Sequence, residues 1–264
     1  MNGDFSNFLN RLWSDVEKIT DADNHNLQEV YGFMEHCDGK PPMQFVEFVY
    51  DQISGTESRA VYSHSLPFML PRIIDSSEWI FSHLSDNKRI LDLGTNTAHN
   101  LIWWASKFEK SKFFGIDISS NSINVANLWR KKANTMNVSL YVGDILEPIP
   151  ELVEQKFDII INSFTIETIP DLSNNNWRIP NWIIDSMNED SIFISCMTVP
   201  NWNRLATIIN QWRSQGLNLH FLDLFPTGGD SSHPYLIFRT SGVDNYLDVD
   251  IPDFMMERIE LLHG

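Results

Sequence analysis

The chain has 264 residues, of which 42% are hydrophobic, and it carries a formal net charge of −16. A chain of this length can bury the core of one full domain and an extension, whereas so strong a negative charge repels phosphate backbones and argues against DNA or RNA as partners. The two cysteines, Cys37 and Cys196, stand far apart without metal-ligand spacing, which argues against a disulfide framework and against a zinc site.

The beginning of the chain shows no targeting signal. No basic region followed by an apolar core stands there, and the whole chain contains no run of 18 apolar residues. We therefore expect a cytoplasmic protein with no membrane partner.

Residues 1–85 show helical patterns. Pro41 and Pro42 interrupt a series of stretches in which apolar side chains recur at roughly helical spacing, namely 7–18, 26–36, 44–53 and 73–84. We interpret residues 1–85 as a helical extension in front of a separate domain.

A short apolar strand, a tight turn of small residues and a helix follow one another in residues 89–105. The strand reads Arg-Ile-Leu-Asp-Leu, the turn reads Gly-Thr-Asn-Thr-Ala, and the apolar run 101–105 belongs to the helix. A strand that feeds a helix through such a turn aims free backbone N–H groups at one point, where a nucleotide-like ligand can bind.

Two further apolar strands end in carboxylates. Residues 112–119 read as a buried strand with Asp117 near its end, and residues 138–144 alternate as a strand does and end at Asp144. A helical pattern lies between them at 121–133. In an open α/β sheet, ligands bind outside the carboxyl ends of the strands, so both carboxylates are candidate site residues.

The remaining apolar runs complete the series of strands. Residues 157–164 and 191–197 read as a fourth and a fifth strand, and residues 217–225 and 235–239 read as the last two. The connection between the last two strands is too short for a crossover helix, so we expect this pair to be antiparallel.

The turn itself distinguishes between two kinds of nucleotide site. A dinucleotide fingerprint needs glycine at its first, third and sixth places, and here those places hold Gly94, Asn96 and His99, so only the first matches. The turn of class I S-adenosylmethionine (SAM) dependent methyltransferases has an acidic residue followed by glycines at alternate places, and Asp92, Gly94, Asn96 and Ala98 occupy those places. Asparagine tolerates a left-handed backbone and alanine is the smallest replacement for glycine, so both departures are mild.

Residues 89–240 therefore resemble the class I SAM-dependent methyltransferase family in the order and spacing of their elements. The resemblance implies an α/β fold that is Rossmann-like and doubly wound, with a seven-stranded, mostly parallel sheet whose last strand is antiparallel. It also implies a SAM-binding core at 86–243, a C-terminal tail at 244–264 that packs on this core, and an N-terminal helical lid formed by residues 1–85.

The resemblance gives the cofactor, SAM, and a set of residues to bind it. Asp117 is expected to accept hydrogen bonds from the ribose hydroxyls, and Asp144 with the backbone of Ile145 is expected to contact the adenine. Arg72, in the lid, could reach the carboxylate of the cofactor. The full set is Arg72, Asp92, Gly94, Thr95, Asn96, Ala98, Asp117, Ile118, Asp144, Ile145 and Asn162.

The acceptor side needs a base if a hydroxyl or an ammonium group is methylated. Histidine has a suitable unperturbed pKa, so His64 in the lid and His233 in the last hairpin are candidates. Glu167 follows the fourth strand, where the family often places groups that face the substrate. No metal is expected.

The sequence thus predicts a SAM-dependent methyltransferase that acts on an oxygen or nitrogen atom of a small molecule, such as a specialised metabolite. A homodimer is compatible with the sequence. The first alternative is a non-catalytic, methyltransferase-like module that binds a cofactor or a partner without transfer, and the replaced glycines motivate it. An enzyme that uses a nicotinamide dinucleotide is the second alternative.

Overall fold

The structure is a computed structural model, and it describes residues 4–36, 43–67, 69–166, 177–199, 201–226 and 232–263. The chain divides into two compact units. The first unit comprises residues 1–87 and 95–144, and the second comprises residues 88–94 and 145–264.

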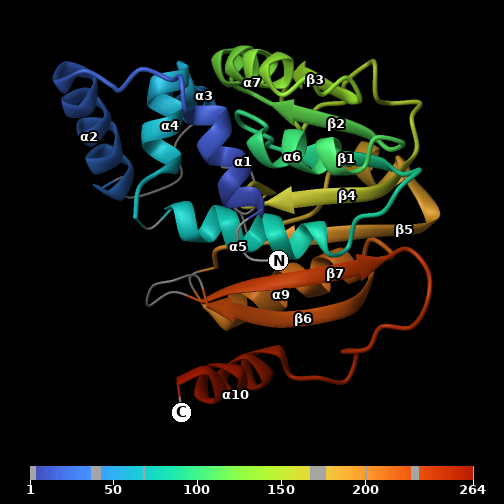
Figure 1. Cartoon of the computed structure of the whole chain (residues 1–264). Helices are drawn as coiled ribbons and strands as arrows, with labels where there is room; N and C mark the ends of the chain where they lie inside the picture. Colours follow the sequence, from blue (N-terminus) through green and yellow to red (C-terminus); the bar gives the residue numbers. More distant parts are fainter. Residues whose placement is uncertain are drawn as a thin grey trace. The chain divides into compact units, whose positions relative to one another are not determined.

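The strands form a seven-stranded sheet in the order β3-β2-β1-β4-β5-β7-β6 (Figure 1). They are β1 (Arg89–Leu93), β2 (Lys112–Asp117), β3 (Val138–Val142), β4 (Phe157–Ser163), β5 (Met187–Cys196), β6 (Asn218–Pro226) and β7 (Ser232–Arg239). The pairs β1–β4, β2–β3 and β4–β5 are parallel, whereas β7 runs antiparallel to both β5 and β6. The predicted fold class and the antiparallel last pair are confirmed.

The first unit combines β2 and β3 with most of the helices. They are α1 (Asp4–Trp13), α2 (Asp21–His36), α3 (Met43–Ser54), α4 (Glu57–His64), α5 (Met69–Phe81), α6 (His99–Lys107) and α7 (Ser120–Lys132). Helix α3 contacts both α4 and α7, and Figure 1 shows α3 and α4 side by side. The N-terminal helices α1 and α3 therefore pack against α6 and α7, the helices that follow β1 and β2.

Helix α4 was not among the predicted elements. Its first turn is fixed by Thr56, whose side-chain oxygen accepts a hydrogen bond from the backbone N–H of Arg59 at 3.3 Å. Such a cap satisfies one of the N–H groups that a helix start leaves unpaired. The helix ends at His64, so this capped segment sets the position of a predicted site residue.

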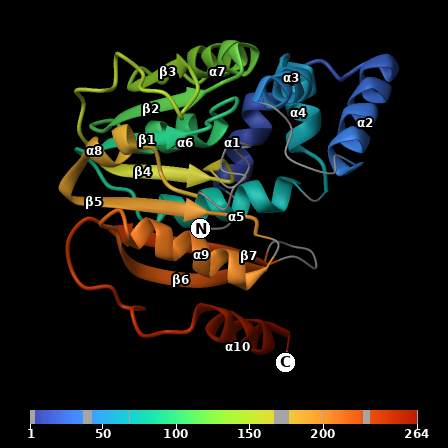
Figure 2. The same ribbon diagram turned by 180° about the vertical axis from the view of Figure 1, so that it is seen from behind.

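The second unit combines the other five strands with α8 (Asn181–Asp185), α9 (Trp202–Arg213) and α10 (Ile251–His263). Its core contains the Trp212 ring, which meets Phe193 and Phe238 edge-on, each at a centroid distance of 5.2 Å. Helix α10 contacts α9 and β6, and Figure 2 shows it alongside β6. Within the part of the chain that the structure describes, no helix has both the length and the apolar character needed to cross a membrane.

Candidate functional site

The turn after β1 keeps a left-handed backbone at alternate residues. The φ angles of Gly94, Asn96 and Ala98 are 67°, 50° and 54°. Asn96 thus adopts the left-handed backbone that asparagine tolerates. Left-handed backbone costs a residue with a Cβ atom about 1–2 kcal/mol, although asparagine tolerates it better than most. The main chain of the turn therefore follows the path expected for glycine at all three positions, although Asn96 and Ala98 carry side chains.

Asn96 has a buried polar atom in its side chain. Its Oδ1 is buried, and no hydrogen-bond partner for it exists among the described residues. An unpaired buried acceptor costs about 1–3 kcal/mol of folding free energy. The Asn96 side chain thus destabilises the folded protein when no ligand is bound.

Replacing Asn96 with glycine is expected to raise the free energy of unfolding by about 1–3 kcal/mol, because it relieves the left-handed backbone and removes the unpaired oxygen. Urea unfolding measures this change. Asn134 is the matched control, since its φ is 53° but its side chain is exposed. Asn134→Gly should stabilise the protein less than Asn96→Gly, and equal effects would show that the buried amide is not a liability.

Asp117, the last residue of β2, lies beside this turn. Its Oδ2 accepts a hydrogen bond from the backbone N–H of Asn96 at 2.8 Å, and its Oδ1 accepts one from the N–H of Ser119 at 2.9 Å. Burial raises the pKa of Asp117 to about 6; the charge of Asp51 adds to the rise, and the two N–H groups oppose it. Each carboxylate oxygen keeps a further lone pair that can accept a ligand hydroxyl.

Two buried histidines lie together in the first unit. The ring centroids of His64 and His99 are 4.5 Å apart, and Thr97 Oγ1 is 3.1 Å from His99 Nδ1. Burial lowers the pKa of His64 to about 4, and burial together with the neighbouring His64 lowers the pKa of His99 well below its usual value. Both rings are therefore neutral near pH 7. Nothing in the sequence pattern indicated this contact.

His233 lies in β7 of the second unit. Its ring meets that of Phe164 edge-on with the centroids 5.5 Å apart, and its Nδ1 is 3.4 Å from Thr198 Oγ1. Phe164, directly after β4, has a φ of 61°, which is an outlier for a bulky side chain. Such strain clusters at functional sites, and sequence reasoning did not identify Phe164.

Asn162 and Asp92 are buried in the second unit. The Nδ2 of Asn162 donates to Ser195 Oγ at 2.9 Å, and its Oδ1 accepts a hydrogen bond from the N–H of Ile166 at 2.8 Å. These bonds tie β4 to β5 and fix the chain that leaves β4. Asp92 stands in β1 opposite Ile161 of β4.

The other predicted site residues are distributed over both units. Thr95 is buried and its N–H donates to the carbonyl of Ile116 at 2.8 Å, while Arg72, Ile118 and Asp144 are half-buried. In the second unit, the buried Ile145 accepts a hydrogen bond through its carbonyl from Trp182 Nε1 at 2.9 Å.

Glu167 lies outside the described residues. Among the residues that are described, no cluster of three or more histidine, cysteine, aspartate or glutamate side chains is arranged to hold a metal.

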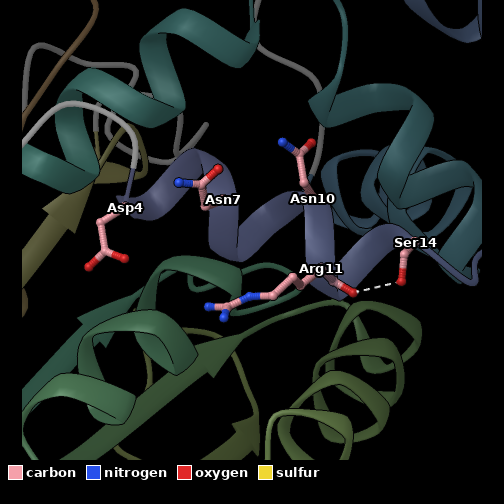
Figure 3. Close-up of a pocket in the computed structure, with 5 residues that line it drawn as sticks. All are labelled: Asp4, Asn7, Asn10, Arg11 and Ser14. Carbon is pink, nitrogen blue, oxygen red and sulfur yellow. Dashed lines mark hydrogen bonds between the residues drawn. The ribbon is translucent and has the colours of Figure 1, made fainter.

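A surface pocket of about 580 Å³ lies elsewhere, along the polar side of α1. Figure 3 shows the residues that line it, Asp4, Asn7, Asn10, Arg11 and Ser14, with Ser14 Oγ donating to the carbonyl of Arg11. None of the predicted site residues lines this pocket, so the candidate site rests on the strand ends and not on this hollow.

Comparison with known proteins identifies the family. Residues 84–219, about half of the chain, match a family model described as a methyltransferase domain. A carboxy-S-adenosyl-L-methionine synthase from Nautilia profundicola is 28% identical over 148 residues, which are 56% of this chain and 60% of that protein. The chain spans 48% to 60% of the length of the curated relatives it matches.

Solved structures share the fold. The N-methyltransferase NodS from Bradyrhizobium japonicum, solved with S-adenosyl-L-homocysteine, has a TM-score of 0.53 at 14% identity, over 66% of this chain and 88% of that one. The [4+2]-cyclase SpnF has a TM-score of 0.53 at 12% identity, over 65% and 80%. With the family match and the turn geometry, these findings confirm the resemblance seen in the sequence, and the chain belongs to the class I SAM-dependent methyltransferase family.

Proposed function

We propose that this protein binds SAM and transfers its methyl group to an oxygen or nitrogen atom of a small molecule, such as a specialised metabolite. The observation that carries the proposal is the turn after β1, where Gly94, Asn96 and Ala98 all keep the left-handed backbone of a glycine pattern. The family match supports the same activity.

The residues present fit this cofactor. Asn96 offers a buried, unpaired oxygen to a donor, and Asp117 offers lone pairs to two hydroxyls at the end of β2. A ribose supplies two neighbouring hydroxyls, and the α-ammonium group of SAM supplies a cationic donor. We therefore propose that the turn 94–98 holds the methionine part and that Asp117 holds the ribose.

The other cofactor residues have the following proposed roles. Asp144 and Ile145 contact the adenine, and the bond from Trp182 to the Ile145 carbonyl fixes that main chain. Arg72 binds the carboxylate of the cofactor, and Asp92 orders the turn after β1 and approaches the methionine part. Thr95 and Ile118 line the cofactor site. Both polar atoms of the Asn162 amide already make a hydrogen bond, so we propose that it acts by holding the chain after β4 in place.

Bound SAM supplies a methyl carbon that its positive sulfur has already activated. The protein must therefore align the acceptor and exclude water. We propose that residues 1–85 form the lid that does so. Two contacts of these helices support it, Asp51 with Ser119 just after β2 and His64 with His99 at the start of α6.

The acceptor proton requires a base. A base works best when its pKa is near the operating pH, and burial lowers the pKa of His64 to about 4. We therefore propose His64 as a neutral hydrogen-bonding group. His233, which is also buried, stays a candidate base. Glu167 stays a candidate for the acceptor side.

The alternative is a non-catalytic, methyltransferase-like module that binds a cofactor or a partner without methyl transfer. A fold does not fix a reaction, and the relatives include proteins named as a carboxy-SAM synthase and a [4+2]-cyclase. The replaced glycines Asn96 and Ala98 favour this alternative.

Saturating SAM is expected to stabilise the protein by roughly 3–4 kcal/mol at 100 to 1,000 times its dissociation constant. Thermal unfolding with and without SAM measures this, and NAD serves as the control ligand. Stabilisation by NAD but not by SAM would contradict the cofactor assignment.

Methyl transfer itself is tested with methyl-labelled SAM and separate pools of small hydroxyl compounds, small amines and RNA. We expect label in a small-molecule pool, because the net charge of −16 repels RNA. Label in RNA would overturn the substrate class, and binding without transfer to any pool would support the non-catalytic alternative.

A further inference from the structure

Helix α3 brings a second carboxylate beside Asp117. Ser119, the N-cap of α7, donates through its Oγ to Asp51 Oδ1 at 2.5 Å, and the same Oγ accepts a hydrogen bond from the N–H of Ser122 at 3.0 Å. The backbone N–H of Ser119 donates to Asp117 Oδ1 at 2.9 Å. One residue therefore bridges a carboxylate of the N-terminal helices and the carboxylate at the end of β2.

The end of α3 lies in contact with the start of α7. A Cβ atom on Gly55, just after α3, would lie 2.0 Å from the Asp51 carbonyl oxygen and 3.5 Å from the Cβ of Asn121. Glycine is thus required for the chain to leave α3 at this point. The hydrogen bond from Ser119 Oγ places the Asp51 side chain at the start of α7.

The Asp51 carboxylate acts on Asp117 through space. Asp51 is the charged side chain that acts on the pKa of Asp117, and it raises that pKa further than burial does alone. The other groups that act on this carboxyl are the backbone N–H groups of Asn96 and Ser119. A ligand that donates two hydroxyls to Asp117, and that carries positive charge, would relieve this repulsion.

We propose that Asp51 is a positioning residue for Asp117, the carboxylate that binds the ribose. Through Ser119 it fixes the Asp117 side chain and couples docking of α3 to cofactor binding. The inference rests on the proposed function, because it takes SAM as the ligand of Asp117. It assigns a cofactor role to a residue of the N-terminal helices that does not itself touch the cofactor.

Three variants separate the effect of the Asp51 charge from the effect of its hydrogen bond with Ser119. Asp51→Asn removes the charge but keeps an oxygen that can accept from Ser119, and Asp51→Ala removes both. Glu109→Gln is the control, because Glu109 is exposed beyond the C-terminal end of α6 and its replacement removes the same charge.

The first measurement is the titration of the Asp117 side chain, followed by carbon NMR of carboxyl-labelled protein without cofactor. Asp51→Asn should move the midpoint to lower pH, whereas Glu109→Gln should leave it unchanged. Equal midpoints in wild type and Asp51→Asn would overturn the coupling, whether or not the protein binds SAM.

The second measurement is the dissociation constant of SAM from pH 5 to pH 8. In Asp51→Asn the pH at which binding weakens should move down with the Asp117 midpoint, and Asp51→Ala should weaken binding several-fold at every pH. A purely structural role would change the affinity without moving the pH profile, and that result would overturn the proposal. Absence of SAM binding in the wild type would instead overturn the proposed function, while the NMR titration still decides the coupling.

Discussion

Replacing Gly94 with alanine is expected to lower the free energy of unfolding by about 2–5 kcal/mol and to abolish SAM binding. The φ of Gly94 is 67°, and a Cβ atom there would lie 2.3 Å from Thr165 Oγ1 and 2.9 Å from its Cβ. The Thr165 side chain cannot easily move away, because its Oγ1 donates to the carbonyl of Leu93 at 2.9 Å. Urea unfolding measures the stability, and titration calorimetry measures the binding.

Gly216 provides the matched control for this substitution. Its φ is 90°, but a Cβ atom there would have no heavy atom within 4 Å. Gly216→Ala should therefore show the backbone cost alone, about 1–2 kcal/mol, and should leave SAM binding intact. If Gly94→Ala is no more destabilising than Gly216→Ala, the turn after β1 is not packed as described.

The sheet could be predicted from the sequence because its signals are local. The strands are short apolar runs, and Asp117 ends one of them, as expected for the carboxyl edge of a parallel sheet. The left-handed backbone of Asn96 could be predicted because asparagine is among the few residues that adopt it readily.

The contacts that complete the site could not be predicted, because they join residues far apart in the sequence. The pairing of His64 with His99 and the bond from Ser119 to Asp51 depend on how the N-terminal helices pack on α6 and α7. Helix periodicity shows that a face is apolar but not which element covers it. The depressed pKa of His64 follows from that packing, so a histidine that looked suited to be a base in the sequence is a weak one in the structure.

The strained backbone of Phe164 could not be predicted from the sequence either. Phenylalanine has no preference for a positive φ, so nothing local indicates one. The N–H of Phe164 donates to the carbonyl of Cys196 at 2.8 Å, and the preceding Asn162 is held by Ser195. Contacts with β5 thus impose this conformation, and only the assembled strands show it.

Replacing Asp117 with alanine is expected to weaken SAM binding about 10- to 150-fold, which corresponds to about 1.5–3 kcal/mol for hydrogen bonds to a charged group. The side chain accepts two backbone N–H groups, so the fold of the variant must be checked by circular dichroism. Asp117→Asn is the control that keeps one acceptor oxygen. An affinity unchanged in a folded Asp117→Ala variant would remove this carboxylate from the cofactor site.

The pH dependence of the wild type gives a second test of Asp117 that needs no substitution. Its pKa in the folded protein is about 6, above the ordinary value of 3.8 for an aspartate, so between about pH 4 and pH 6 the folded state holds a proton that the unfolded state releases. The contribution of this group to stability without cofactor therefore falls as the pH rises through that window. In the proposed site the ribose hydroxyls of SAM donate to Asp117, and such bonds favour the ionised carboxylate. Binding should therefore release a proton near pH 6 and weaken as the pH falls below 6.

Calorimetry in two buffers of different ionisation enthalpy measures the proton release. A dissociation constant that stays the same from pH 5 to pH 8, with no proton released, would show that the ribose hydroxyls do not bind Asp117.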